Sequence, residues 1–493
     1  MRFAIIPLLI TFLHAQDTAK PEEKKAEAAT VTKAATVTKQ DTVTIDGKKI
    51  DYRVTAATLN LKSDKDKDRA SIFHVSYERI GMTDRHERPV VFAFNGGPGS
   101  SAVWLHMGAL GPRIVPTTPD GTKTLPPPLT VRENPFSILD VADIVFIDPV
   151  STGFSRVTGE TKPNEFLGVQ GDIKSVGDFI RRWVTENDRW ASPKYLLGES
   201  YGGIRATGLA DHLQSTHGMS LNGVVLLSSL IDFRTLSSSN ADDLTYAVFL
   251  PGHTATAHFH KKITGDRDTL VKEARAFAFG PYYQALLKGA AIPADEKQAM
   301  AAQLAKFTGL PASLHLETDL RLSSTRFRKE LLRDEKKVLG RFDARLAWPA
   351  TNSDSDYPAY DPSYAVAYGA FGTAINDYLS RDLGWEGHHP YQILSGSVNR
   401  SWNWGTDRRS VNMSRNLESA LIENPNLEVL VMCGYADLAT PPANMQYSID
   451  HLFGIPDDRR EAIKFTWYEA GHMFYLNQPD LEKMRKDLVE FIK

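Results

Sequence analysis

Residues 194–203 read "KYLLGESYGG", an apolar run that ends in a serine flanked by glycines. The run is typical of a buried strand, and the segment "GGIRATGLADHLQ" after it has the composition of a helix. Gly198 and Gly202 stand on either side of Ser200 in a G-x-S-x-G pattern, where Cβ atoms would collide across a tight turn. The alternative, a loop serine with incidental glycines, does not account for the strand and helix around it. Ser200 is therefore a candidate nucleophile at a strand–elbow–helix turn.

Similar apolar runs recur on both sides of this turn and alternate with helical segments. They are "PVVFAFN" (89–95), "ADIVFID" (142–148), "GVVLLSS" (223–229), "LEVLVMCG" (427–434) and "IKFTWYE" (463–469). Before them, "TVTIDGKKIDYRV" alternates around Asp46-Gly47, the pattern of a hairpin with a type I′ turn, and "ASIFHVSYERIG" (70–81) adds another alternating strand. Near-continuous apolar strands between helices predict an α/β fold: a mostly parallel, doubly wound sheet preceded by antiparallel strands.

A long insertion separates "GVVLLSS" from "LEVLVMCG". It contains two charge-rich amphipathic stretches, "PADEKQAMAAQLAKF" and "STRFRKELLRDEKKVLGRF". We predict that residues 234–375 form an inserted helical cap, and that residues 41–233 and 376–493 together form the catalytic domain.

The N-terminus has the features of an export signal. "MRFAIIPLLITFLHAQ" combines an early arginine, an apolar run and a small residue at Ala15, which predicts a signal peptide over 1–15 that is too short to span a bilayer. Residues 16–40 are charged and contain "AATVTK" twice, which predicts a disordered tether. We therefore expect a periplasmic or secreted protein with no integral membrane span. The single cysteine, Cys433, lies in an apolar run and is expected to be an inert buried thiol.

Composition excludes several other classes of function. The net charge of −3 and the absence of basic blocks argue against nucleic-acid binding. No spacing typical of a metal site occurs, and the clusters "HFH" (258–260) and "HHP" (388–390) are expected to be packing or surface histidines. We expect no metal or cofactor, and a peptide or small acyl substrate. The sequence does not indicate an oligomeric state.

A serine nucleophile needs a base, and the base needs an acid to orient it. In a strand–elbow–helix sheet these follow the serine in the order acid, then histidine, at the ends of the last strands. Asp437 follows a strand in "VMCGYADLATP", and His472 follows the next in "YEAGHMFY". Asp450 is a weaker alternative acid because it lies in a helical stretch.

Acyl transfer also needs donors for the oxyanion of the tetrahedral intermediate. One is the N–H after the nucleophile, here that of Tyr201. The glycine-rich loop of "VFAFNGGPGSSAVW" (91–104) follows a strand and exposes backbone N–H groups without side chains in the way. Gly97 in this loop is the candidate second donor.

Five motifs in order, "FNGGPGSS", "DPVSTGFS", "GESYGG", "GYADLATP" and "AGHM", resemble the serine carboxypeptidase family, the carboxypeptidase Y-like enzymes of α/β-hydrolase fold. The resemblance covers about residues 50–235 and 375–493. It implies a serine-type peptidase that removes C-terminal residues through an acyl-enzyme. It also implies nucleophile Ser200, acid Asp437, base His472, oxyanion donors Gly97 and Tyr201, and contacts to the substrate's C-terminal carboxylate from Asn95, Gly96 and Glu199.

The sequence departs from the family pattern at two substrate-binding positions. Ala93 stands where members carry tryptophan, and Ala109 where they carry a glutamate that shares a proton with the elbow glutamate, here Glu199. An esterase or acyltransferase on the same triad, or a non-catalytic binding protein, are the alternative functions. Because Ala109 provides no carboxyl partner to raise the pKa of Glu199, we expect His472 to set the acid limb of activity, with a rise through about pH 6–7.

Overall fold

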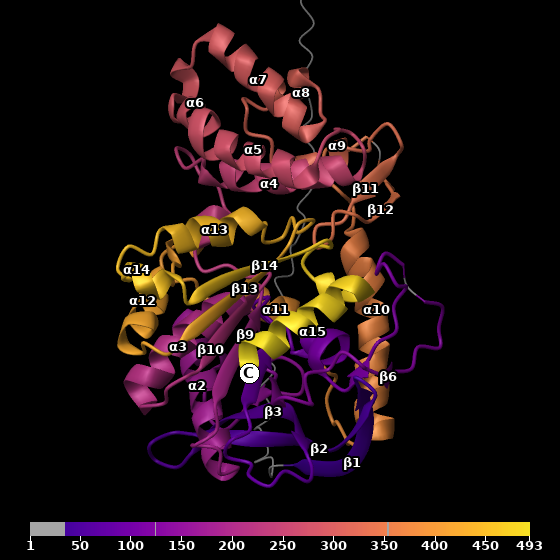
Figure 1. Ribbon diagram of the computed structural model, residues 1–493, viewed down its shortest axis with the longest axis vertical. Coiled ribbons are helices and arrows are strands. Elements are labelled where there is room, and N and C mark those ends of the chain that lie inside the picture. The colour runs from indigo at the N-terminus through magenta and orange to yellow at the C-terminus, as the bar shows by residue number, and fades with distance from the viewer. Residues whose placement is uncertain (1–34, 124, 353) are drawn as a thin grey trace, which may run out of the picture.

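The computed structural model describes residues 35–493 except 124 and 353 (Figure 1). The predicted signal peptide, and the predicted tether up to residue 34, lie outside the described residues. Within the part that is described, no helix has both the length and the apolar composition needed to cross a bilayer.

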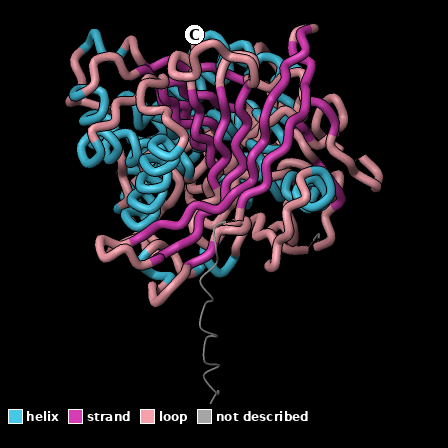
Figure 2. Tube along the Cα trace, turned by 90° about the horizontal axis from the view of Figure 1, so that it is seen from below, coloured by secondary structure: helices cyan, strands magenta, loops and turns pink. Residues whose placement is uncertain are grey.

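A ten-stranded sheet forms the centre of the molecule, in the order β1-β2-β3-β7-β4-β9-β10-β13-β14 with β8 paired to β3 (Figure 2). The strands are β1 (Thr36–Ile45), β2 (Lys48–Lys62), β3 (Asp68–Arg79), β4 (Val90–Phe94), β7 (Asp143–Ile147), β8 (Arg156–Val157), β9 (Lys194–Glu199), β10 (Gly223–Leu227), β13 (Glu428–Gly434) and β14 (Ile463–Tyr468). Pairing from β1 to β7 is antiparallel, and pairing from β7 through β4 to β14 is parallel. The predicted α/β fold, with antiparallel strands first, is confirmed.

Helices cover both faces of this sheet. One face carries α1 (Val103–Leu105), α10 (Pro362–Asp377) and α15 (Gln478–Ile492), and the other carries α2 (Val169–Glu186), α3 (Gly202–His217), α12 (Ser414–Glu423) and α13 (Pro442–Asp450). In β4, Val91 and Ala93 belong to the first core, and Val90 and Phe92 to the second. Because both sides of the strand are buried, its sequence is continuously apolar.

The N-terminal hairpin corrects the predicted end of the tether. Strand β1 pairs with β2 from Thr36 to Ile45, so residues 36–40 belong to the sheet. The second copy of "AATVTK" supplies β-branched residues that favour a strand when a partner lies alongside. The turn between the strands lies at Asp46 and Gly47, with φ of 47° and 73°, as the predicted type I′ turn requires.

The insertion after β10 forms a cap, at the top of Figure 1, over the end of the sheet. It contains α4 (Leu244–Phe259), α5 (Arg267–Phe277), α6 (Tyr283–Leu287), α7 (Ala294–Thr308), α8 (Ala312–Glu317), α9 (Ser324–Glu330) and the hairpin of β11 (Lys337–Leu339) and β12 (Ala347–Pro349). One of its apolar clusters includes Ala436 and Leu438, so the cap packs directly on the loop after β13.

The structure places the C-terminal boundary of the cap earlier than the predicted residue 375. Helix α10 runs beside the sheet rather than within the cap (Figure 1), and its Phe371 packs on Trp104 with ring centroids 5.1 Å apart. Tyr378, just after α10, accepts a 3.0 Å hydrogen bond from the Tyr77 hydroxyl in β3. The apolar side of α10 is buried against the catalytic domain, so the cap ends before Pro362.

Candidate active site

Ser200 lies in a sharp turn between β9 and α3. Its φ of 63° is in the left-handed region, which a non-glycine residue adopts only when its surroundings hold it there. A Cβ on Gly198 would lie 2.1 Å from the carbonyl oxygen of Gly202, so the turn can close only with glycine at 198. The Ser200 N–H donates a 3.1 Å hydrogen bond to Leu227 O in β10, which ties the turn to the sheet.

Asp437 and His472, predicted as acid and base, are in direct contact. Asp437 Oδ2 lies 2.8 Å from His472 Nδ1, and both residues are buried. The other carboxylate oxygen accepts the N–H groups of Ala439 and Thr440 at 2.7 and 2.9 Å. A carboxylate fixed in this way favours the proton on Nδ1, which leaves Nε2 as the basic nitrogen.

Thr440 is a member of the site that the sequence interpretation did not single out. Its hydroxyl lies 2.8 Å from Asp437 Oδ2, 3.0 Å from His472 Nδ1 and 2.7 Å from Ser228 O. Thr440 lies in the motif "GYADLATP", and the sequence feature that could have identified it is its position three residues after Asp437. The alternative acid, Asp450, instead forms a 2.7 Å ion pair with Arg275.

The charges around His472 act on its pKa in opposite directions. Burial lowers the pKa, whereas the negative charge of Asp437 and the hydrogen bond to it raise the pKa. Glu199 also raises it, Arg341 lowers it, and the net result is a pKa above the ordinary histidine value. His472 is therefore neutral only above the usual histidine range, higher than the pH 6–7 expected from an ordinary histidine pKa.

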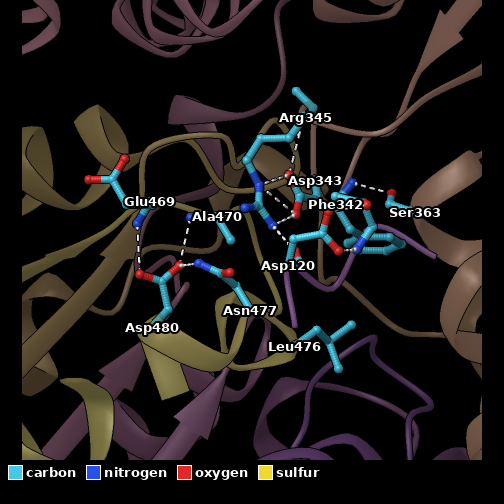
Figure 3. A network of polar contacts seen from close by, with 12 residues as sticks. Asp120, Phe342, Asp343, Arg345, Ser363, Glu469, Ala470, Leu476, Asn477 and Asp480 are labelled. Atoms are coloured by element: carbon cyan, nitrogen blue, oxygen red, sulfur yellow. Dashed lines mark hydrogen bonds and ion pairs between the residues drawn. The ribbon is translucent and has the colours of Figure 1, made fainter. Parts of the chain in front are cut away.

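The loop that carries His472 is held from below by Asp480, at the start of α15 (Figure 3). The Asp480 carboxylate accepts the N–H groups of Glu469 and Ala470 at 3.0 and 2.8 Å, and the side-chain amide of Asn477 at 2.8 Å. The backbone immediately before the base is therefore fixed by a buried carboxylate.

The cap holds the same loop from the other side. We call residues 340–346 the cap strap; Phe342 O accepts the His472 N–H at 2.5 Å, and the two rings lie 5.2 Å apart. Arg341 O accepts the N–H of Leu438 at 3.1 Å, next to the acid. Figure 3 shows the strap in turn anchored by Ser363, which accepts the Phe342 N–H at 2.9 Å. The strap therefore contacts the loops of both the acid and the base, and no motif marked it in the sequence.

The glycine-rich loop after β4 packs against the serine turn. A Cβ on Gly96 would lie 2.4 Å from the backbone nitrogen of Tyr201, so the two segments meet with no room for a side chain. Gly97 has a φ of +102°, which favours glycine. Among the described residues, neither the Gly97 N–H nor the Tyr201 N–H donates a hydrogen bond to the protein. Two free donors beside the nucleophile are what an oxyanion site requires.

Glu199 is buried beside the serine and does not behave as the sequence predicted. Its Oε2 accepts hydrogen bonds from Asn95 Nδ2 at 2.8 Å and from the Tyr475 hydroxyl at 2.9 Å. Burial raises its pKa to about 7, although the charge of His472 and both hydrogen bonds act to lower it. The expectation that Glu199 would keep an unraised pKa was therefore wrong, because burial, with a smaller contribution from the charge of Asp437, raises it without a carboxyl at position 109.

Tyr475 lies near Ala109, the position at which family members carry a glutamate. Ala109 is buried, and a Cβ on its neighbour Gly108 would lie 2.8 Å from a ring carbon of Tyr475. A phenol beside Glu199 donates a hydrogen bond and, with its own pKa raised by burial, keeps its proton. Tyr475 follows His472 by three residues, and sequence reasoning missed it.

The other polar residues singled out in the sequence lie outside the candidate active site. His258 and His260 bond the carbonyls of Gly265 and Ala344 at 3.0 and 2.7 Å, consistent with packing roles. Cys433 is buried, and burial raises the pKa of its thiol, as expected for an inert residue. In the part of the chain that the structure describes, no group of three or more His, Cys, Asp or Glu side chains is arranged to hold a metal.

Comparison with known proteins identifies the family of the chain. The family model for serine carboxypeptidases matches residues 59–473. The lysosomal protective protein of Mus musculus is 28% identical over 178 residues, which are 35% of this chain and 33% of that protein. Serine carboxypeptidase-like 20 of Arabidopsis thaliana is 32% identical over 130 residues, 25% of this chain and 24% of that protein. The chain thus aligns with about a third or less of these curated relatives.

Among solved structures, a prohormone-processing carboxypeptidase from Saccharomyces cerevisiae superposes with a TM-score of 0.53 and 17% identity, covering 89% of this chain and 91% of that chain. This likeness supports the α/β-hydrolase fold. The family model spans most of the chain, including the serine turn and the loops that carry Asp437 and His472. The protein therefore belongs to the serine carboxypeptidase family.

Proposed function

We propose that the chain is an exported serine carboxypeptidase that removes C-terminal residues from peptides through an acyl-enzyme. The observation that carries this proposal is the buried Asp437–His472 pair, at 2.8 Å, at the same end of the sheet as the Ser200 turn. A neutral imidazole oriented by a carboxylate is the base that a serine hydroxyl needs.

In the proposed acylation step, Ser200 Oγ attacks the carbonyl carbon of the last peptide bond and His472 Nε2 takes the hydroxyl proton. Asp437 stabilises the resulting imidazolium through the Nδ1–H hydrogen bond. The N–H groups of Gly97 and Tyr201 donate to the oxyanion of the tetrahedral intermediate. His472 then protonates the leaving amine, and the C-terminal residue departs.

Deacylation repeats these steps with water. His472 Nε2 removes a proton from water, the hydroxide attacks the acyl ester, and the serine oxygen recovers its proton from the imidazolium. Asn95, Gly96 and Glu199 lie beside the serine turn and are proposed to contact the substrate's carboxyl terminus. A Glu199 that is protonated near neutral pH can donate a hydrogen bond to that carboxylate, which an ionised Glu199 would repel.

The assignment is tested with a fluorophosphonate probe and matched peptide and ester substrates. Wild-type protein should label at Ser200 and hydrolyse peptides with a free C-terminus, whereas Ser200→Ala should lose labelling and about 10⁴-fold or more of turnover. Ser215→Ala, an exposed serine on α3, is the matched control and should retain both. Turnover retained by Ser200→Ala would contradict the triad, and turnover of esters alone would point to the esterase alternative.

A further inference from the structure

A cavity of about 250 Å³ lies between the cap and the loop that carries the catalytic acid. Its walls come from α4, from the segment that begins α9, from the cap strap and from the loop after Asp437, where Leu438 and Ala439 line it. Three arginines also line it: Arg328, Arg341 and Arg408. Their side chains arrive from three segments that are distant in sequence, so the fold rather than a local motif gathers the charge.

Two of these arginines have no counter-charge. Within residues 35–493 as described, neither Arg341 nor Arg408 has a carboxylate at ion-pair distance. Arg328 donates a 3.0 Å hydrogen bond to Leu339 O and lies 3.8 Å from Asp361, the one acidic group in contact with the set. Three guanidinium groups therefore face the cavity against a single carboxylate, which itself caps α10.

The unpaired guanidinium groups are held in place by aromatic rings. The Arg408 guanidinium carbon lies 4.5 Å from the Phe233 ring centroid and 4.9 Å from that of Trp404. The Arg341 guanidinium lies 5.3 Å from the Phe342 ring centroid. Stacking leaves the planar edges, with their N–H donors, free for an anion.

The positive charges of Arg341 and Arg408 also repel each other. Burial lowers the pKa of Arg408, and the charge of Arg341 lowers it further, so the cations are close together in a partly buried space. Arginine does not lose its proton at physiological pH, so the repulsion persists until an anion neutralises it. An oxyanion bound between them would gain charge-assisted hydrogen bonds, which are stronger than neutral ones.

The segments that line the cavity are connected to the loops of the candidate triad. Leu438 and Ala439 directly follow Asp437, and Arg341 precedes Phe342, whose carbonyl oxygen accepts the His472 N–H. Trp404, beneath Arg408, packs edge-on against Tyr201 with centroids 6.0 Å apart. A group bound in the cavity can therefore belong to the molecule whose carbonyl lies at the serine.

We propose that this cavity binds a carboxylate of the substrate between Arg341 and Arg408. The inference rests on the proposed function, because the carboxylate must belong to the peptide being cleaved. Because the terminal carboxylate is assigned to Asn95, Gly96 and Glu199, the carboxylate in this cavity comes from an Asp or Glu side chain of the peptide. The hydroxyl of Ser324, which lines the cavity and has no partner among the described residues, adds a further donor.

Three otherwise identical peptides test whether the cavity takes a side-chain carboxylate. One ends in alanine with a free carboxylate, one in alanine amide and one in glutamate amide. Arg341→Gln and Arg408→Gln should each reduce the preference for the glutamate-amide peptide over the alanine-amide peptide by about 10-fold or more, the effect of losing a charge-assisted hydrogen bond. A loss confined to the glutamate-amide peptide supports the proposal, and a loss confined to the free acid would overturn it. Arg408→Lys, which keeps the charge, should retain part of the preference.

The control is Arg415→Gln, an exposed arginine for which the structure gives no polar contact among the described residues. Binding of the same three peptides to Ser200→Ala, measured by calorimetry, gives a readout that does not depend on turnover. Equal affinity for all three, or an equal loss for all three in folded Arg341→Gln and Arg408→Gln, would overturn the proposal. Absence of turnover in wild-type protein, with carboxylate binding still dependent on the arginines, would count against the proposed function only.

Discussion

At the residue scale, the proton on Glu199 is controlled by neighbours that also act on the base. Asn95 and Tyr475 both donate to its Oε2, and its charge raises the pKa of His472. With a pKa raised by burial to about 7, Glu199 loses its proton near neutral pH, and its charge then acts on His472. The two groups therefore act as a coupled pair, and the acid limb of the rate profile belongs to both.

The variant Glu199→Gln separates the contribution of Glu199 to the acid limb from that of His472. Glutamine can still accept the hydrogen bonds of Asn95 and Tyr475, but it removes the negative charge that raises the pKa of His472. The pKa of His472 should fall, so the base stays neutral at lower pH. The acid limb of kcat/KM, measured with an alanine-amide peptide, should move toward lower pH. Glu490→Gln, an exposed position on α15, should leave the limb in place. An unmoved limb in Glu199→Gln would show that Glu199 does not act on the base.

At the scale of elements, the cap strap connects the cap to the loops that carry Asp437 and His472. Its backbone accepts hydrogen bonds from His472 and Leu438, so a displaced strap would move both the base and the loop of the acid. Gly471 is the point of closest approach, because a Cβ there would lie 2.1 Å from Phe342 O and 2.6 Å from Asp343 Cα. Only glycine lets the strap lie on the histidine loop.

Gly471→Ala should push the strap away and misplace His472. We expect kcat to fall by about 10²-fold, the scale of a misplacement of about 1 Å in a catalytic group. Gly369→Ala provides the matched control, since that exposed glycine on α10 has no neighbour near its added Cβ. Circular dichroism would establish that both variants fold. A folded Gly471→Ala enzyme with normal kcat would show that the strap is not needed to position the base.

The elements that sequence predicted best are those whose pattern is local. The strand runs around Ser200, Asp437 and His472 are continuous and apolar, and the glycines at the turn report a steric requirement directly. The strap and the arginine cavity leave no such pattern, because their partners lie in segments far apart in sequence. The raised pKa of Glu199 was missed for a related reason: burial is a property of the folded molecule.

At the scale of the whole molecule, several ionisable groups are buried in their neutral forms. Burial lowers the pKa of four histidines, to about 4 in His74 and His315 and to about 3 in His106 and His253. In the unfolded chain each would titrate near 6.5. Since the folded values are depressed for a base, the unfolded state binds more protons below pH 6.5, and stability falls as the pH falls.

Two buried carboxyl groups have the opposite effect on the pH dependence of stability. Burial raises the pKa of Asp148 and of Glu199 to about 7. These acids take up protons in the folded state before they do in the unfolded state, so each adds stability as the pH falls from about 7 toward about 4. As the pH falls from 7 to 5, each of these histidines lowers the free energy of unfolding by about 2 kcal/mol, and each of the two acids raises it by about the same amount. With four histidines against two acids, the net change is destabilising.

The free energy of unfolding should therefore decline moderately from pH 7 to 5 and more steeply below pH 5. Below pH 5 the two acids are already protonated in the folded state, and they begin to take up protons in the unfolded state as well, so their contribution to stability levels off. The four histidines continue to lower the free energy of unfolding until the pH reaches their pKa values in the folded state. Urea unfolding at intervals from pH 7 to 4 measures the slope. His253→Leu removes one of the four groups and should reduce the histidine share of the slope by roughly a quarter, whatever its effect on stability at pH 7. The exposed His388→Leu is the matched control and should leave the slope unchanged. A slope identical in wild type and His253→Leu would mean that buried neutral histidines do not set the acid sensitivity of this fold.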